Sequence, residues 1–224
     1  MANPNCTTMA VMLPAKALHD AFCLTAMVCT SFQAAGGAGQ KGMDELHAQV
    51  DTVRGHDLVN AGASAAASVE AKVHAKALAF NVVPWLGSQV EGGYSDEEMK
   101  LRDESRKILD LPGLNVAPTC VRVPVMVGHA IEVRATFERP VDLDEAMSAL
   151  GAFPNLELDD IPTPLEWAGR DEVAVGRVRA DLYDDHSLNF FVVGDNLLKG
   201  AALNTVQIAE LLHARGLVGG TARV

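Results

Sequence analysis

Apolar residues recur at helical spacing in several parts of the chain. Asn5 is a good N-cap residue and an apolar-periodic segment follows it, so the sequence predicts a first helix that begins at about Cys6. Pro14 is expected to kink or restart this helix. Ser95 and Glu98 form a capping box at the start of another. The remaining helices are predicted at residues 43–54, 142–150 and 199–214.

Alternating or continuous apolar runs rich in β-branched residues predict the strands. These lie at residues 24–32, 79–86, 156–158, 173–178 and 188–193, with two more between 114 and 140. Residues 58–78 are alanine-rich and are expected to form a loop or a weak helix. The order lacks the regular alternation of strand and helix that a doubly wound sheet requires. We therefore expect one α+β domain over residues 1–224, with a mixed or mostly antiparallel sheet and helices packed on one face.

The composition narrows the class of protein. The 224 residues are 49% hydrophobic and 21% charged, which is typical of a soluble globular chain. A net charge of −11 argues against a nucleic-acid partner, because phosphate contacts need clustered Lys and Arg. No apolar run reaches the length of a membrane span and no signal peptide opens the chain, so a cytoplasmic protein is expected. The cysteine and histidine spacings indicate no metal site.

Cys6 has the most reactive sequence context of the four cysteines. A thiol in the first turn of a helix lies near free backbone N–H groups and the positive end of the helix dipole, which stabilise a thiolate. The alternative is a small residue at a helix start. Cys23 and Cys29 share one face of a predicted strand, and Cys120 lies in another β-rich run, so all three are expected to be buried and unreactive.

A glycine-rich turn follows the first strand. Gly37, Gly39 and Gly42 match the G-x-G-x-x-G pattern of dinucleotide-binding folds, but the surrounding βαβ series and the acidic residue about 20 positions on are absent. A Rossmann site is therefore not expected here. The glycines are instead expected to let backbone approach a ligand and to leave N–H groups free for it.

Five polar residues stand out as candidates for chemistry. Gln33 ends the first strand, Glu98 and Lys100 lie in the helix capped by Ser95, and Arg122 and His129 flank a break between two strands. Each has a structural alternative, such as a plain salt bridge for Arg122, a satisfied core histidine for His129, or a solvated helix surface for Glu98 and Lys100.

Seven segments in one order resemble the aspartate-semialdehyde dehydrogenase family over nearly the whole chain, and look most like its actinobacterial branch. They are residues 3–8 (Asn-Pro-Asn-Cys-Thr-Thr), 31–34, 79–84, 119–129, 162–165, 175–177 and 194–204. The resemblance implies a fold similar to the C-terminal domain of glyceraldehyde-3-phosphate dehydrogenase. It also implies the NADPH-dependent conversion of L-aspartyl-4-phosphate to L-aspartate 4-semialdehyde, at the branch leading to lysine, threonine and methionine.

The resemblance assigns a role to each matching position. Cys6 looks like the nucleophile that forms an acyl-thioester, His129 its general acid/base, and Gln33 the residue that positions the reacting carbonyl. Arg122 and Glu98 resemble the groups that bind the substrate's carboxylate and amine, and Asn5 and Lys100 resemble phosphate ligands. Positions that touch NADP are matched by Gly36, Gly37 and Asn196.

The chain departs from the family pattern in two ways. Family members usually carry Ser where this chain has Gly36, and the resemblance begins at the family's second half, so its N-terminal NADP-binding domain and one phosphate-binding arginine are expected to be missing. We then expect a homodimer that binds NADP weakly, with an exposed apolar stripe on the final helix, about 198–214, that normally packs on the missing domain. Catalysis would need a dinucleotide-binding domain supplied separately. The alternatives are a catalytically silent dimerisation module and a relative of N-acetyl-glutamyl-phosphate reductase.

Overall fold

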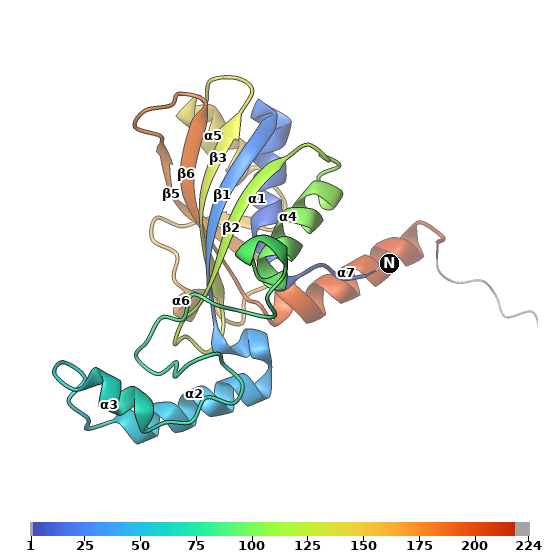
Figure 1. The fold of residues 1–224 in the computed structure, drawn as a ribbon. Helices are drawn as coiled ribbons and strands as arrows, with labels where there is room; N and C mark the ends of the chain where they lie inside the picture. Colours follow the sequence, from blue (N-terminus) through green and yellow to red (C-terminus); the bar gives the residue numbers. More distant parts are fainter. Residues whose placement is uncertain (1, 218–224) are drawn as a thin grey trace, which may run out of the picture.

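The computed structural model describes residues 2–217 and consists of one mixed sheet with helices packed against it (Figure 1). The helices longer than one turn are α1 (Cys6–Phe22), α2 (Gln40–Val53), α3 (Gly62–Ala67), α4 (Asp96–Ile108), α5 (Leu143–Gly151) and α7 (Leu203–Ala214). Shorter helical segments are η1 (Ala35–Ala38), η2 (Glu91–Gly93), α6 (Pro164–Trp167) and the π-helical η3 (Leu198–Ala202).

Six strands form the sheet in the order β2-β1-β3-β6-β5-β4. They are β1 (Leu24–Gln33), β2 (Asn115–Arg122), β3 (His129–Phe137), β4 (Leu156–Leu158), β5 (Val173–Ala180) and β6 (Ser187–Gly194). The two outer pairs, β1 with β2 and β4 with β5, are parallel, and the inner pairs are antiparallel. The expected α+β class with a mixed sheet is confirmed.

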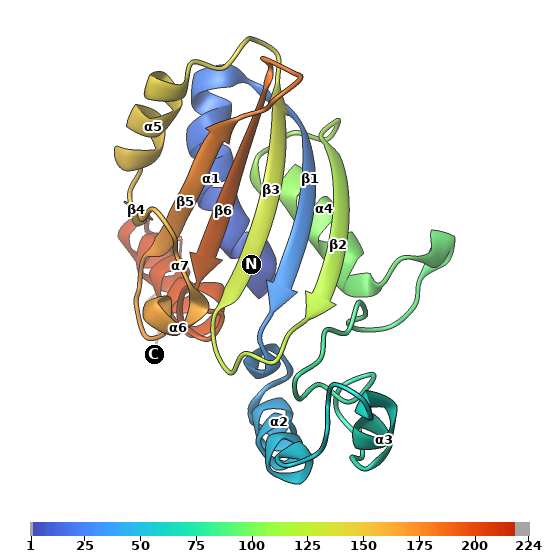
Figure 2. The same cartoon turned by 90° about the vertical axis from the view of Figure 1, so that its left-hand side faces the viewer.

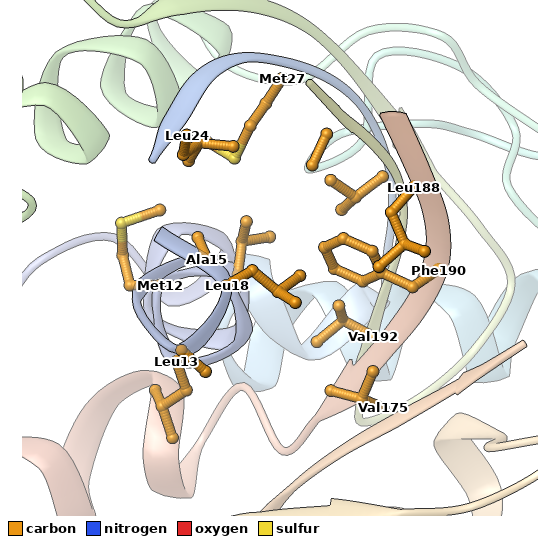
Figure 3. Close-up of a cluster of buried hydrophobic side chains, with 14 of the residues drawn as sticks. Met12, Leu13, Ala15, Leu18, Leu24, Met27, Val175, Leu188, Phe190 and Val192 are labelled. Atoms are coloured by element: carbon orange, nitrogen blue, oxygen red, sulfur yellow. The ribbon is translucent and has the colours of Figure 1, made fainter. Parts of the chain in front are cut away.

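Helices α1, α4 and α5 cover one face of the sheet, and the other face is largely open (Figures 1 and 2). The main core lies between α1 and the sheet, where side chains of β6 such as Phe190 and Val192 face Leu18 of the helix (Figure 3). Full burial of each such side chain contributes about 1.5–3 kcal/mol to folding. The single turn α6 packs Trp167 on the opposite face, against Ala174 and Val193.

Two segments extend from this body. Residues of α2, α3 and the following loop form an arm beyond one end of the sheet (Figures 1 and 2). Its small core joins Leu46 of α2 to Leu78 and Val83. Helix α7 projects away from the sheet (Figure 1), and Asn204 is its one buried residue. Within residues 2–217, no helix combines the length and apolar character needed to cross a membrane.

Three local predictions are wrong. Residues 79–86 form no strand and contribute one bridge, Val83 to Arg122. Pro14 does not restart α1, which runs unbroken to Phe22. Cys23 is exposed, because it ends α1 in a left-handed conformation with φ 63° and does not enter β1, whereas Cys29 and Cys120 are buried as expected. The helices capped by Ser95 and Asp142 form as predicted.

Candidate active site

Strands β1, β2, β3 and β6 have one terminus each at the same end of the sheet. Because β1 and β2 are parallel, Gln33 and Arg122 end side by side and are register partners. Strand β3 is antiparallel to β1 and begins at this edge with His129, whose partner Gly194 ends β6. Residues that are far apart in the sequence, from Cys6 to Asn196, thus lie together near the start of α1.

Cys6 is the first residue of α1. The side chain of Asn5 caps the helix by accepting a hydrogen bond of 2.9 Å from the Thr7 N–H, which fixes where the helix begins. The Cys6 Sγ lies 3.2 Å from His129 Nε2. A Cβ built on Gly200 of η3 would lie only 2.8 Å from the Cys6 Cβ, so this glycine allows η3 to close over the cysteine.

The thiol of Cys6 is not activated by its helix alone. Burial raises its pKa above the ordinary value, and the negative charge of Glu97 raises it further. The polar groups of Thr7 and the backbone N–H of Cys6 favour the thiolate and lower the pKa, but by less. The expectation that the helix N-terminus would favour a thiolate is therefore wrong for the ligand-free molecule, since the desolvation that opposes it depends on tertiary packing.

His129 is fully buried, and both of its ring nitrogens are engaged. Its Nε2 faces Cys6, and its Nδ1 accepts a hydrogen bond of 3.1 Å from the Ala34 N–H. Burial and the nearby charge of Arg122 lower the pKa of His129 to about 3. The ring packs over Gly37, where a built Cβ would lie 3.2 Å from the His129 Nε2.

Arg122 is a largely buried cation next to this pair. Its Nη1 donates a 2.5 Å hydrogen bond to the Ala34 carbonyl and would lie 2.7 Å from a Cβ on Gly37. Within residues 2–217 it forms no ion pair with a carboxylate. A cavity of about 350 Å³ is lined by Arg122, His74 and Trp85 among others. A desolvated cation without a counter-ion beside a cavity is the arrangement expected of an anion-binding site.

Glu97, and not the predicted Glu98, belongs to the polar group at the start of α1. Its carboxylate accepts hydrogen bonds from Asn5 Nδ2 at 2.8 Å and from Lys100 Nζ at 2.7 Å. Glu98 instead closes the capping box by accepting from the Ser95 N–H at 2.8 Å, and it also accepts from the Cys120 N–H at 3.0 Å. The capping box visible in the sequence accounts for one oxygen of Glu98, whereas the contact of the other oxygen with β2 is a tertiary feature.

Gln33 is buried at the same edge, but its amide does not contact the reactive pair. Its Nε2 donates to Ser31 Oγ at 3.2 Å and to Cys120 Sγ at 3.5 Å. The backbone carbonyl of Gln33 accepts from Val123 N–H, which joins β1 to the segment after β2. Gln33 thus lies in the site's wall, and a role in positioning a carbonyl needs a change of rotamer.

The positions expected to touch NADP are Gly36, Gly37 and Asn196, and they lie close to His129. The N–H groups of Gly36 and Gly37 are not free, since they donate to Met126 O at 2.9 Å and Ala34 O at 3.0 Å. A Cβ on Gly36 would meet Met126 O at 2.7 Å, which leaves no room for a serine side chain without a backbone shift. Asn196 Oδ1 accepts from the Gly128 N–H at 2.8 Å and so holds the residue before His129.

Asp195 stabilises the turn that carries Asn196. It was not among the candidate site residues predicted from the sequence. Its buried carboxylate accepts from Leu197 N–H and Gly169 N–H, both at 2.7 Å, and thereby fixes the turn that carries Asn196. An acidic residue directly after an apolar strand was the available signal. Among the described residues, no group of three or more His, Cys, Asp or Glu side chains is arranged to hold a metal ion.

A cysteine in contact with a buried histidine, next to an arginine that has no carboxylate partner among the described residues, is an arrangement typical of nucleophilic sites, and here an α+β domain carries it. Residues 15–199 match the family model described as the semialdehyde dehydrogenase dimerisation domain. The chain belongs to this family.

Individual relatives agree with the family match. The chain is 49% identical over 217 residues to aspartate-semialdehyde dehydrogenase of Streptomyces akiyoshiensis, and 48% identical over 218 residues to that of Corynebacterium glutamicum. These alignments cover 96% and 95% of this chain. Aspartate semialdehyde dehydrogenase II of Vibrio cholerae, solved in complex with ASA, superposes with a TM-score of 0.88 at 38% identity over 96% of this chain.

The coverage of the relatives is partial. The chain spans 64% of the Streptomyces protein, 63% of the Corynebacterium protein and 62% of the Vibrio structure. Aspartate semialdehyde dehydrogenase of Candida albicans, solved with NADP, shares the fold at a TM-score of 0.69 and 24% identity.

Proposed function

We propose that this chain is the thioester-forming catalytic and dimerisation part of a cytoplasmic, NADP-dependent aspartate-semialdehyde dehydrogenase. The enzyme would convert L-aspartyl-4-phosphate to L-aspartate 4-semialdehyde for the synthesis of lysine, threonine and methionine. The observation that carries the proposal is the contact of Cys6 Sγ with His129 Nε2, 3.2 Å apart, beside an arginine that has no carboxylate partner. The similarity to aspartate-semialdehyde dehydrogenases at 48–49% identity supports the choice of substrate.

Cys6 would attack the acyl carbon of the substrate. The S–C bond forms, the C–O bond to phosphate breaks, and the electron pair leaves with the phosphate, which ends with the thiol proton. A covalent thioester keeps the acyl group in the site until it is reduced. His129, in contact with the sulfur, would assist this step, and Gln33 would orient the carbonyl after turning from Ser31 and Cys120.

The charged groups fit the remaining parts of an aspartyl phosphate. Arg122 would bind the α-carboxylate, since a guanidinium pairs with a carboxylate through two parallel hydrogen bonds. Glu97 would bind the α-ammonium group in place of Glu98, whose oxygens are committed to backbone. Lys100 and Asn5 would contact the phosphate, and the ion pair of Lys100 with Glu97 would loosen when the substrate enters.

The described residues could contact only part of an NADP molecule. Asn196 lies beside Gly36, and its amide nitrogen would lie 3.6 Å from a Cβ there, so the two residues form a small polar corner. The engaged N–H groups of Gly36 and Gly37 offer no cradle for a pyrophosphate. NADPH, when bound, would supply a hydride to the thioester. A separate dinucleotide-binding domain would hold most of the cofactor, and the exposed apolar residues of α7, including Val206 and Leu211, would pack on it.

The open face of the sheet would form a homodimer. Phe32 and Phe191 are in contact on this face, with ring centroids 6.3 Å apart, and the nearby Val28 is exposed. A sheet face that only the single turn α6 covers, in a family defined as a dimerisation domain, is the surface that a second copy would bury. Light scattering would report the mass of a dimer.

Acylation without NADP tests the proposed function. The chain, mixed with freshly prepared L-aspartyl-4-phosphate, should gain one aspartyl group by intact mass spectrometry and release an equal amount of phosphate. The Cys6→Ser variant should show neither, and Cys29→Ser is the matched control at a buried thiol outside the site. A chain that stays unmodified under conditions where Cys6 reacts with iodoacetamide would instead indicate a catalytically silent dimerisation module.

A further inference from the structure

Asn5, the residue before Cys6, has each of its hydrogen-bonding groups engaged. Its carbonyl accepts from the Met9 N–H at 3.0 Å and its Oδ1 accepts from the Thr7 N–H at 2.9 Å, both inside α1. Its two donors, the side-chain Nδ2 and the backbone N–H, instead bind helix α4. Asn5 therefore links the start of α1 to a second element of the fold.

Two carboxylates of α4 accept from these donors. Glu97 binds the Asn5 Nδ2 and Glu104 binds the Asn5 backbone N–H, both at 2.8 Å. Glu104 lies seven positions after Glu97, which is about two helical turns, so both side chains leave the same face of α4. Glu97 also pairs with Lys100, whereas Glu104 forms no ion pair within residues 2–217. The carboxylate of Glu104 is thus committed to the backbone of Asn5.

Helix α4 is fixed to the sheet at two points. Near its start, Glu98 accepts from the Cys120 N–H of β2 at 3.0 Å. Near its end, Arg106 donates through Nε to the Leu114 carbonyl, directly before β2, at 2.8 Å. A side chain of α4 is therefore placed relative to the strand that ends at Arg122.

The segment that leads into α1 depends on such contacts. Residues 2–5 form neither helix nor strand, so no ladder of backbone hydrogen bonds holds them. Cys6 follows directly, with its Sγ 3.2 Å from His129 Nε2. A shift of Asn5 would move the first turn of α1 and the sulfur with it. A misplacement of about 1 Å in a catalytic group costs on the order of 10²-fold in rate.

We propose that Glu104 is a positioning residue for the nucleophile, because it holds the Asn5 N–H and so fixes where α1 begins and where Cys6 lies. The proposal rests on the proposed function, and it adds a residue that touches neither the substrate nor the reacting atoms. A backbone N–H needs an acceptor at hydrogen-bonding distance. The reach of the Glu104 side chain is therefore essential to this role, and its negative charge is not.

Two variants separate reach from charge. Glu104→Gln keeps the length of the side chain and an oxygen that accepts, whereas Glu104→Asp keeps the charge but is one methylene shorter. In single-turnover acylation by L-aspartyl-4-phosphate, Glu104→Gln should keep more than about a third of the wild-type rate at saturation, since a neutral acceptor binds an N–H less strongly than a carboxylate does. Glu104→Asp should lose about 10-fold to 100-fold, with the half-saturating substrate concentration changed by less than about threefold. Asp103→Asn is the matched control on α4, because Asp103 is exposed and pairs only with its neighbour Arg102 among the described residues.

Equal losses in the two variants, or a larger loss in Glu104→Gln, would overturn the proposal when melting curves show that both are folded. So would a Glu104→Asp chain that acylates at the wild-type rate.

Amide hydrogen exchange tests the same contact without substrate. Mass spectrometry of the peptide that contains the start of α1 should show faster exchange in Glu104→Asp and nearly wild-type exchange in Glu104→Gln. Equal exchange in all three chains would contradict the proposal. If the wild type is not acylated, the proposed function fails, and the exchange data alone decide whether Glu104 holds the start of α1.

Discussion

His129 and Arg122 both pack against Gly37, so Gly37→Ala should disturb both side chains. The added Cβ would lie 2.7 Å from Arg122 Nη1 and 3.1 Å from His129 Cε1, where ordinary contacts begin at 3.4 Å. Arg122 must therefore retreat by about 0.7 Å and the His129 ring by about 0.3 Å. A 1 Å misplacement of a catalytic group costs on the order of 10²-fold in rate. We expect the acylation of Cys6 to slow by about 10-fold to 100-fold.

The assay is single-turnover acylation by L-aspartyl-4-phosphate, followed by quenched-flow mass spectrometry. The backbone at Gly37 needs no left-handed conformation, so alanine is not excluded by its φ angle. Overpacking should lower the free energy of unfolding by about 1–3 kcal/mol, which thermal denaturation measures separately. Gly62→Ala is the matched control, because a Cβ there meets nothing within 4 Å.

The reasoning would be refuted by a Gly37→Ala chain that acylates within about twofold of the wild type. That result would mean that Arg122 and His129 can both move without consequence, so their positions over this glycine do not matter. A melting curve shows whether a variant that fails in acylation is unfolded at room temperature, in which case the loss of acylation does not report on the site. Alkylation of Cys6 by iodoacetamide then reports whether the nucleophile is still in place.

Three further predictions follow from the charges of the site. Glu97→Gln should shift the midpoint of Cys6 alkylation to lower pH, because the carboxylate raises the pKa of the thiol; an unchanged midpoint would contradict this. Glu98→Gln should lower the free energy of unfolding in urea by about 0.5–2 kcal/mol through the weakened cap, and it should leave acylation intact, unless Glu98 binds substrate after all. The lowered pKa of His129, about 3 against 6.5 in the unfolded chain, means that the unfolded state binds the extra proton. Stability should therefore fall by about 1.4 kcal/mol per pH unit as the pH drops below 6.5, a slope that His129→Gln should remove in urea titrations.

Local sequence signals were enough to predict where the helices with side-chain N-caps begin. Asn5, Ser95 and Asp142 each satisfy backbone N–H groups two or three positions ahead, and each starts a helix where it was expected. The apolar run at 79–86 has strand composition but lies in the arm, where Leu78 and Val83 pack on Leu46 of α2. That choice depends on a contact more than 30 positions away in the sequence, which no local pattern contains.

The candidate site was predictable in its membership and less so in its electrostatics. Cys6, Arg122 and His129, which the family resemblance placed in one site, lie together in the structure. The pKa of Cys6 was misjudged because the helix N-terminus is a local feature, whereas its burial under η3 and its proximity to Glu97 are tertiary ones. The resemblance pointed to Glu98, whose second carboxylate oxygen is occupied by the Cys120 N–H, a tertiary contact that the capping box in the sequence does not reveal.

The charges of Arg122 and Glu97 in the ligand-free site are complementary to the charged groups of the proposed substrate. Arg122 has no carboxylate partner among the described residues, and Glu97 raises the pKa of the nucleophile. An aspartyl group carries one carboxylate and one ammonium group on the same carbon, so it would neutralise both without changing the net charge of the site. With Glu97 compensated by the ammonium group, the thiol would ionise more readily, and Cys6 would become reactive when its substrate is bound. The shift expected for Glu97→Gln is thus a measure of how strongly substrate binding activates the nucleophile.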